Sequence, residues 1–264
     1  MIEKTVPATP IVDEATTPSH VRAWLGNPNL ASSLRTVVTA RLIVALGSML
    51  ALTVPASAGS MMVAKDTENN DRAADMRAIY AIEDRAEAIA EGEKTGNAAI
   101  VAARESIARW RSLRTTLAQK GASGRTLVQM DTSIKELART LNDSRTIERA
   151  ANDVTGALAP LFAVVGESIP ADVHSLDYLG RSISLDATMA QWGRAGHDAY
   201  ALDRAWLRLK PLVATKKNGR KVVVMFDAAV RRARDGAHDR DSEEAQTGAT
   251  AVGNAVDAVE GLYT

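Results

Sequence analysis

The sequence predicts an all-α protein of two tandemly duplicated four-helix units, each an up-down bundle, after an N-terminal export signal. Three observations lead to this class. The 264 residues are 46% hydrophobic but only 4% aromatic, so alanine and aliphatic side chains must fill the core, as is typical of packed helices. Apolar residues recur at spacings of three and four, the period of one helix face. The same pattern returns about 96 residues later.

The first element is the apolar segment Leu42–Val54. Arg35 and Arg41 precede it and Ala56-Ser57-Ala58 follow it, which is the order of a basic flank, an apolar core and a small-residue cleavage site. Residues 1–58 are therefore expected to be a disordered leader plus signal peptide that is removed after Ala58. An uncleaved signal anchor is the main alternative, and a buried core helix is a further one. Export by either route places the remaining chain in the periplasm or at the cell exterior.

Residues 59–168 are expected to form the first unit, with helices near residues 71–92, 97–119, 125–142 and 145–167. Its clearest apolar stripe has a 3-4-3-4 spacing and consists of Leu127, Met130, Ile134, Leu137 and Leu141. The side chains expected in its core are Leu127, Ile134, Leu137, Val154 and Leu158. Pro160 lies inside the fourth helix and is expected to kink or shorten it.

Residues 169–264 are expected to form the second unit, with helices near residues 172–192, 195–215, 220–236 and 242–262. Trp206 follows Trp110 by 96 residues, and the two indoles are expected at equivalent places. The side chains expected in the second core are Val223, Phe226, Val230, Val252 and Val256. Four helices with short connections normally close into an up-down bundle. A linear helical solenoid is the alternative arrangement.

Several kinds of chemistry are excluded or unsupported by the sequence. The chain has no cysteine, which excludes disulfides, thiolate metal sites and thiol nucleophiles. Neither a Walker loop nor a Gly-x-Ser-x-Gly or His-Glu-x-x-His motif occurs. After residue 58 the only histidines are His174, His197 and His238. We therefore assign no catalytic residue and no metal ligand, and we predict that the protein is not an enzyme and needs no cofactor.

Two segments offer weaker candidates for an ion or a cofactor. The acidic run 238–244 carries oxygen ligands but lacks the alternating spacing of a calcium loop, so a capped helix start is the preferred interpretation. Met130, Met189 and Met225 could pair with a histidine on haem, although methionine on an apolar stripe normally fills the core. An exported metal- or haem-binding four-helix carrier is thus the alternative function.

The candidate binding residues are Trp192, Tyr200 and Lys217, because the second unit carries aromatic residues and a basic turn without close counterparts in the first. Lys217 belongs to the basic run 216–221, which is either a solvated turn or a contact for lipid phosphate or an acidic partner. The aromatic side chains have a second interpretation as core filling. Residues that differ between two copies of one unit carry information about binding, so the second unit is expected to make most partner contacts.

The leading functional expectation is an exported binding or interaction protein without a catalytic site. Its partner is expected to be a protein or a small ligand of the cell envelope. Basic and acidic residues are equal at 32 each, so no net charge favours nucleic acid or an anionic membrane. Membrane contact is expected only through Leu42–Val54, if that segment is an uncleaved anchor.

Overall fold

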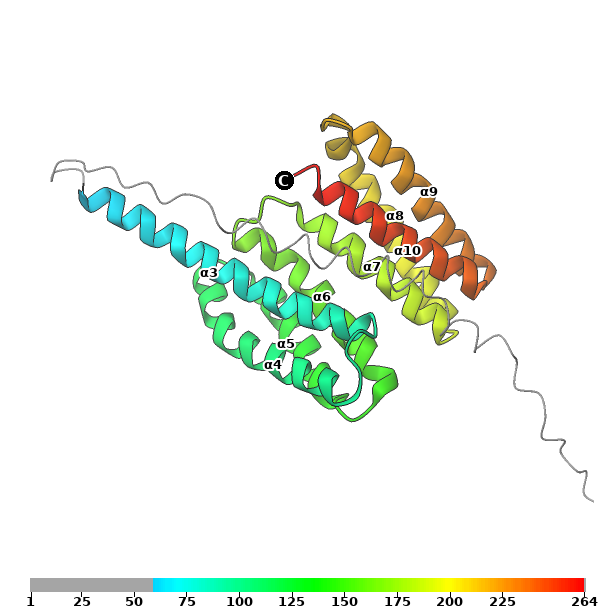
Figure 1. Cartoon of the computed structure of the whole chain (residues 1–264), viewed down its shortest axis with the longest axis horizontal. Coiled ribbons are helices and arrows are strands. Elements are labelled where there is room, and N and C mark those ends of the chain that lie inside the picture. The colour runs from blue at the N-terminus through cyan, green and yellow to red at the C-terminus, as the bar shows by residue number, and fades with distance from the viewer. Residues whose placement is uncertain (1–58, 264) are drawn as a thin grey trace, which may run out of the picture. The chain divides into compact units, whose positions relative to one another are not determined.

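A computed structural model describes residues 59–263, with side chains described for 70–143 and 146–263 (Figure 1). The leader, the apolar segment Leu42–Val54 and the expected cleavage position after Ala58 lie outside the described residues. Among the helices of residues 59–263, none combines the length and the apolar character that crossing a membrane requires.

The described chain is all-α, which confirms the predicted class. In order, the helices are α3 (Gly59–Ala90), α4 (Gly96–Gln119), α5 (Gly124–Arg139), α6 (Ser144–Val164), α7 (Ala171–Thr188), α8 (Trp192–Thr215), α9 (Gly219–Asp239) and α10 (Ser242–Glu260). Local signals explain two of the helix starts. The Ser123 hydroxyl accepts a hydrogen bond from the Thr126 N–H at the start of α5, and the Asp241 carboxylate accepts one from the Glu244 N–H at the start of α10.

Two predicted boundaries are wrong. The first helix begins at Gly59 instead of near residue 71, because the polar residues before Asp71 continue the helix although they carry no apolar stripe. The helix predicted to end at Trp192 ends at Thr188, where Ala190 adopts a left-handed backbone with φ of 54°. Trp192 therefore opens α8. Inside α6, the helix continues past Pro160 to Val164.

Each helix packs against the next one in sequence, and short turns make consecutive helices antiparallel. In addition, α3 packs against α6 and α10 packs against α7, which closes α3–α6 and α7–α10 into two groups of four. The two groups meet mainly where α6 packs on α7. The alternation puts the α4–α5, α6–α7 and α8–α9 turns at one end, together with the start of α3 (Figure 1).

Two clusters of buried apolar side chains lie one in each group of helices. The first runs from Ile79 to Val165 and the second from Val173 to Val259. All five side chains expected in the first core are buried, as are Phe226, Val230, Val252 and Val256 in the second. Val223 is only half-buried, whereas Val222 is buried. Val222 precedes Phe226 by four residues and Ala229 by seven, so it lies nearer the centre of the buried face.

A tryptophan fixes the second helix of the first group to the third. The Trp110 indole N–H donates a hydrogen bond of 2.8 Å to the Asp131 Oδ1. Arg114, one turn after Trp110, donates from Nε to both carboxylate oxygens of Asp131 at 2.9–3.0 Å. The buried indole therefore has its polar group satisfied, while the ion pair lies nearer the surface.

The second group makes the same contact 96 residues later. The Trp206 indole N–H donates a hydrogen bond of 2.7 Å to the Asp227 Oδ1. Lys210 Nζ donates to both oxygens of the same carboxylate, at 2.8 and 2.9 Å. The two tryptophans thus play the same role between the second and third helices of their groups.

The apolar stripe of α5 yields a stability prediction. Ile134 is buried in the first core, and Ile134→Ala is expected to lower the free energy of unfolding by about 2–5 kcal/mol through lost burial and a residual cavity. Val128 lies on the same helix with 60% of its surface exposed, so Val128→Ala is expected to change it by less than about 0.5 kcal/mol. Urea unfolding of both variants measures the difference, and equal losses would contradict the burial of the stripe.

Candidate functional site

The three sequence-predicted binding residues all lie on or beside α8 but not together. Trp192 is the first residue of α8 and packs half-buried against the second core. Tyr200 lies two turns later and is 63% exposed. Lys217 is exposed in the turn after α8. A helix of 24 residues is about 36 Å long, so Trp192 and Lys217 lie at its opposite ends.

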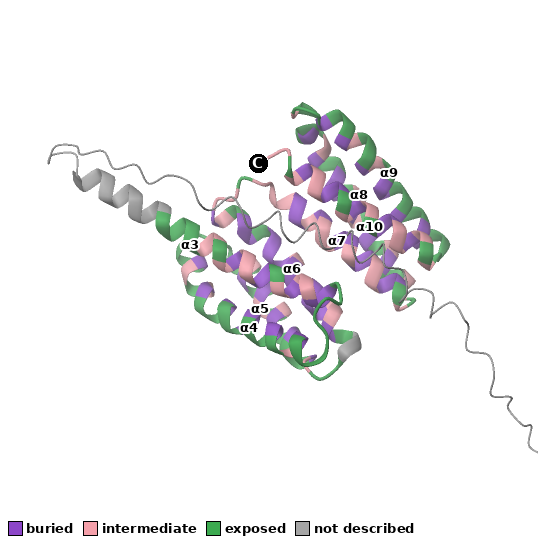
Figure 2. Ribbon diagram, in the orientation of Figure 1, coloured by how far each residue is buried: buried purple, intermediate pink, exposed green. Residues whose placement is uncertain are grey.

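Large apolar side chains are exposed mainly on α8 and α9. Five such side chains are found on these two helices: Tyr200, Leu207, Leu212, Val224 and Met225. The described part of the first group exposes two, Val101 and Val128. Figure 2 shows the exposed residues of α9 in green, between buried and intermediate ones. Tyr200 and Leu207 are seven residues apart, about two turns, and therefore lie on the same face of α8.

A second feature, which sequence reasoning did not find, is a set of buried and partly buried polar residues between the two groups of helices. We call this set the polar seam; it consists of Glu83, Arg149, Asn152, Thr155, His174, Arg181, Ser182, Asp186 and Asp198. It lies where α3 and α6 face α7 and the start of α8. Burying so many polar groups is unfavourable unless they pair with each other.

Arg149 is the centre of one half of the polar seam. Its guanidinium lies 2.9 Å from the Asp186 carboxylate, 3.3 Å from that of Asp153 and 3.4 Å from that of Asp198. Asp186 is fully buried, and this burial, with the nearby charge of Asp198, raises its pKa to about 6 despite the opposing effect of Arg149. Burial likewise raises the pKa of Asp153. One cation therefore faces three carboxylates.

Arg181 is the centre of the other half. Its guanidinium contacts the carboxylates of Asp177 at 2.7 Å, Glu87 at 3.1 Å and Glu91 at 3.4 Å. Its Nε donates a hydrogen bond of 3.0 Å to Asn152 Oδ1. Burial opposes the charge of Arg181, but the three carboxylates outweigh it, so the pKa of Arg181 is raised. The contacts link α7 to both α3 and α6.

His174 occupies the end of the seam nearest the α6–α7 turn. Its Nδ1 lies 3.2 Å from Glu83 Oε1, and its ring stacks on Phe162 with centroids 3.8 Å apart and planes at 4°. Burial disfavours the imidazolium, but the hydrogen bond and charge of Glu83 prevail, and the pKa of His174 is raised. Within the described residues, His174 Nε2 has no hydrogen-bond partner. This arrangement holds α7 against α3 and α6.

The sequence contained a pattern from which part of the polar seam could have been predicted. His174 follows Val173 on α7, and Asp186 stands between Ile183 and Ala187, so both polar residues interrupt a stripe of buried positions. A charged residue on such a stripe predicts a buried partner. The partners of these residues lie on α3, α6 and α8. Which residues they are depends on tertiary packing, and the spacing of residues along the sequence does not predict it.

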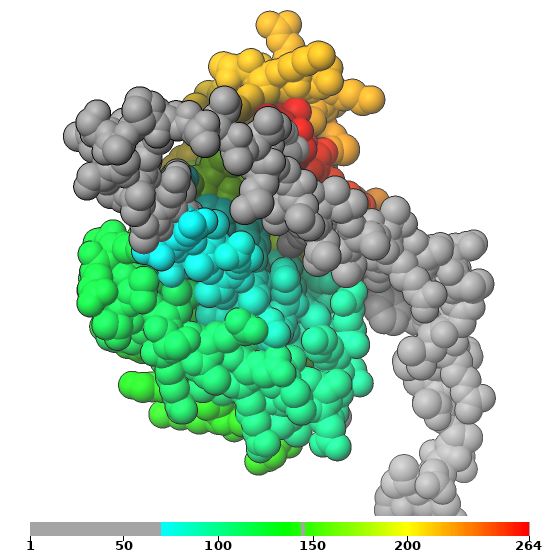
Figure 3. Space-filling model, turned by 60° about the vertical axis from the view of Figure 1, so that its left-hand side comes forward, coloured from blue at the N-terminus to red at the C-terminus, as the bar shows by residue number. Residues whose placement is uncertain are grey.

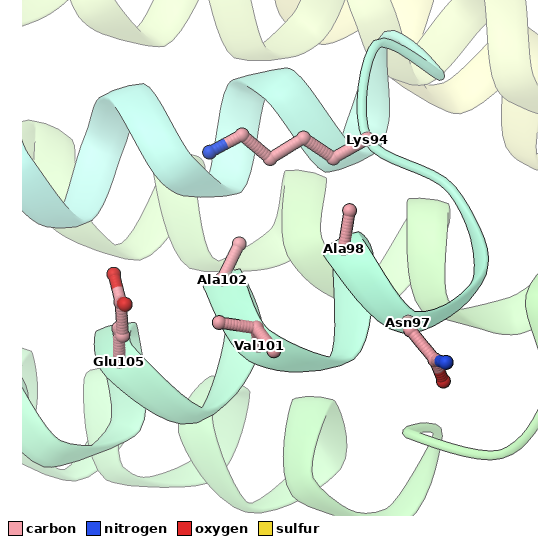
Figure 4. A pocket seen from close by; sticks show the side chains of 6 residues that line it. All are labelled: Lys94, Asn97, Ala98, Val101, Ala102 and Glu105. Atoms are coloured by element: carbon pink, nitrogen blue, oxygen red, sulfur yellow. The ribbon is translucent and has the colours of Figure 1, made fainter.

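Surface hollows are shallow and lie away from the predicted residues. One of about 350 Å³ is lined by Lys94, Asn97, Ala98, Val101, Ala102 and Glu105. Figure 4 shows the Lys94 side chain extending from the α3–α4 turn above Ala98 and Ala102 of α4. Another lies beside Tyr178 and Asp153, at the contact of α5, α6 and α7. Neither is lined by Trp192, Tyr200 or Lys217.

In the acidic run 238–244, the carboxylates of Asp241 and Glu244 are engaged in local contacts. Asp241 caps α10, and Glu244 forms an ion pair of 2.8 Å with Arg232 of α9. Among the residues that the structure describes, no three side chains of histidine or acidic type gather in a way that would hold a metal ion. Met130 is fully buried in the first core.

Comparison with known proteins adds no relationship: no family model, no curated protein and no solved structure matches this chain.

The Arg149 contacts yield a stability prediction. Arg149→Met is expected to cost about 3–5 kcal/mol in the free energy of unfolding, because it leaves the buried carboxylate of Asp186 uncompensated. Arg139→Met is the control, since the pair of Arg139 with Glu136 is exposed and its loss should cost at most about 1 kcal/mol. Adding Asp186→Asn to Arg149→Met should restore part of the loss. Chemical denaturation of the three variants measures this, and no rescue would contradict the proposed cause.

The raised pKa of Asp186 yields a pH prediction. The folded protein holds this proton up to about pH 6, whereas the unfolded chain releases it near 3.8. Between these values, rising pH ionises the unfolded chain first, so the folded state loses stability. Relative to Asp186→Asn, the native protein is expected to lose up to about 3 kcal/mol between pH 4 and 7. Unfolding at a series of pH values measures the difference, and a constant difference would contradict the prediction.

Proposed function

We propose that this chain is an exported, non-catalytic interaction protein that works in the periplasm or at the cell exterior. In this proposal its helices form two duplicated up-down four-helix units, residues 59–168 and 169–264. The repeated contacts support the duplication, because unrelated helices have no reason to place a tryptophan, a cation and an aspartate at one 96-residue offset. The two separate apolar clusters support the same division.

The observation that carries the functional proposal is the exposed apolar face of α8. Tyr200 and Leu207 are 63% and 54% exposed, and Arg204 lies between them on the same side of the helix. Their exposure costs the isolated protein a favourable burial of about 1.5–3 kcal/mol per large side chain. Exposed apolar residues on a rigid element are typical of protein contact surfaces.

The chemistry of this face fits a protein partner better than a small ligand. Tyrosine and arginine are enriched among the residues that dominate binding energy in protein interfaces. Small ligands prefer concave sites that enclose most of their surface. Tyr200 and Leu207 line neither of the two hollows described above. In this proposal Trp192 supports the start of α8 from the core side and does not contact the partner.

This proposal predicts site-specific crosslinking at position 200. The full chain carrying Tyr200→p-benzoylphenylalanine is expressed in its native host and irradiated, and a single adduct of defined mass is expected. Arg104 is the matched control, because it is exposed and lies on α4 at the equivalent position 96 residues earlier. The same probe at Arg104 should give no such adduct, and Leu207→Glu should remove the adduct at position 200 by placing a charge in the contact. Equal adducts from both positions, or none from either, would contradict the proposal.

The alternative function, a metal or haem carrier, stays a prediction. The candidate methionines are dispersed between the two groups: Met130 is buried in the first core, and Met225 is exposed on α9. Absorbance and elemental analysis of protein from its native compartment test this alternative. A stoichiometric metal or a haem spectrum would support the carrier and would count against the interaction protein as the whole function.

A further inference from the structure

The α8–α9 turn concentrates positive charge and exposed apolar side chains. We call this region the basic tip; it consists of Leu212, Lys216, Lys217, Arg220, Lys221 and Val224. Leu212 is 55% exposed near the end of α8, and Val224 is 70% exposed near the start of α9. In Figure 3 the segment around this turn, coloured yellow to orange, protrudes at the top of the view. It is a projection, not a groove.

The charge of this region is segregated along the sequence as well. Residues 204–226 contain seven basic residues and no acidic residue, in a chain whose total charge is zero. Arg208 pairs with Asp172, and Lys210 pairs with Asp227. Lys216 lies 4.0 Å from the centre of the Tyr263 ring. The described contacts leave Lys217, Arg220 and Lys221 exposed and without an ion pair.

The stability of α9 does not explain the basic residues Arg220 and Lys221 at its start. Arg220 and Lys221 lie in the first turn of α9, which contains no acidic residue. The start of a helix carries the positive end of the macrodipole, so cations there oppose helix formation and anions favour it. When the starts of α5 and α9 are aligned, Arg220 corresponds to Arg125, whereas Lys217 and Lys221 correspond to Ala122 and Thr126, so the equivalent turn of the first group carries only one of these cations. A four-helix group therefore does not require the charges of Lys217 and Lys221.

The end of the molecule that carries the basic tip also carries the start of α3. The contact of Lys216 with Tyr263 places the tip beside the end of α10. The Arg72 guanidinium donates to the carbonyls of Val165 and Gly166, so the first part of α3 lies beside the α6–α7 turn at this end. Along the sequence, the apolar segment Leu42–Val54 ends five residues before Gly59.

We propose that the basic tip docks on the surface of an anionic phospholipid bilayer. Lys217, Arg220 and Lys221 contact lipid phosphates, while Leu212 and Val224 enter the boundary between headgroups and acyl chains. Basic side chains at a projecting turn, with exposed aliphatic side chains on the two helices that flank it, match a flat, anionic surface with an apolar interior. An acidic protein surface would satisfy the cations equally, but a bilayer has an apolar interior directly behind its anionic groups, which can receive both exposed aliphatic side chains. This contact goes beyond the proposed protein partner on the face of Tyr200 and Leu207, and it differs from the sequence expectation that Leu42–Val54 is the only membrane contact.

Vesicle binding by the full chain tests the proposal. The probe is vesicles of phosphatidylglycerol and phosphatidylcholine, compared with vesicles of phosphatidylcholine alone. The variant Arg220→Glu with Lys221→Glu is expected to reduce binding to the anionic vesicles at least tenfold, because each basic residue near the surface contributes about 1 kcal/mol of attraction. The variant Leu212→Ser with Val224→Ser should reduce it severalfold. Any binding through Leu42–Val54 is common to all variants and to both kinds of vesicle.

The matched control reverses the same charge elsewhere on α9. Arg231→Glu with Arg234→Glu makes the same change at exposed positions two to four turns from the tip, and its vesicle binding should stay within about twofold of the native protein. The tip variant should melt no lower than the native protein, because glutamate suits the first turn of a helix. Equal losses in both variants, or binding unaffected by lipid charge, would overturn the proposal. Tip-dependent binding to polyglutamate without binding to vesicles would overturn it in favour of an acidic protein partner.

Discussion

The neutralisation of carboxylates between the helices by Arg149 and Arg181 is the interaction on which the rest of this fold depends. Each arginine contacts carboxylates from more than one helix, and together the two link α3, α6, α7 and α8. Apolar packing alone holds helices together without defining one alignment, because small shifts bury similar areas. Charges in a dry environment are sensitive to such shifts, so these contacts favour one register of α7 on α6.

The apolar pattern was sufficient to predict the helices but not the seam. The stripes of α5 and α10 contain Ile134 and Val252 at a clear helical period, and both side chains are buried. A period reports which face of a helix is covered and says nothing about which helix covers it. Asp186 and its partner Arg149 are 37 residues apart and become neighbours only when α6 meets α7. The error at Trp192 has a simpler cause, since helix ends depend on single backbone angles such as that of Ala190. The error at Val223 is a shift of one residue in the buried face of α9, because Val222 lies nearer the centre of that face.

The candidate surfaces show that the total charge and the overall apolar content of a chain do not predict where its charged and apolar side chains lie. A total charge of zero gives no support for binding to nucleic acid or an anionic membrane, yet residues 204–226 are entirely free of acidic side chains. Similarly, the overall apolar content gives no indication that exposed Tyr200 and Leu207 share one face. Trp192, Tyr200 and Lys217 were grouped because the second unit carries them without close counterparts in the first. On a helix as long as α8, residues that are close in sequence can still lie about 36 Å apart.

The two paired tryptophans also equip each half of the protein with its own optical probe. Trp206 stacks on Phe226, with ring centroids 4.1 Å apart and planes at 14°, whereas the residue 96 positions before Phe226 is Met130. The two indoles thus have similar hydrogen bonds but different neighbours. With Trp24 and Trp192 replaced, a chain retaining only Trp110 or only Trp206 reports the melting of one half by its fluorescence. The fluorescence of these two chains then shows in solution, without any added label, which half unfolds first. It also shows whether the polar seam makes the two halves unfold together.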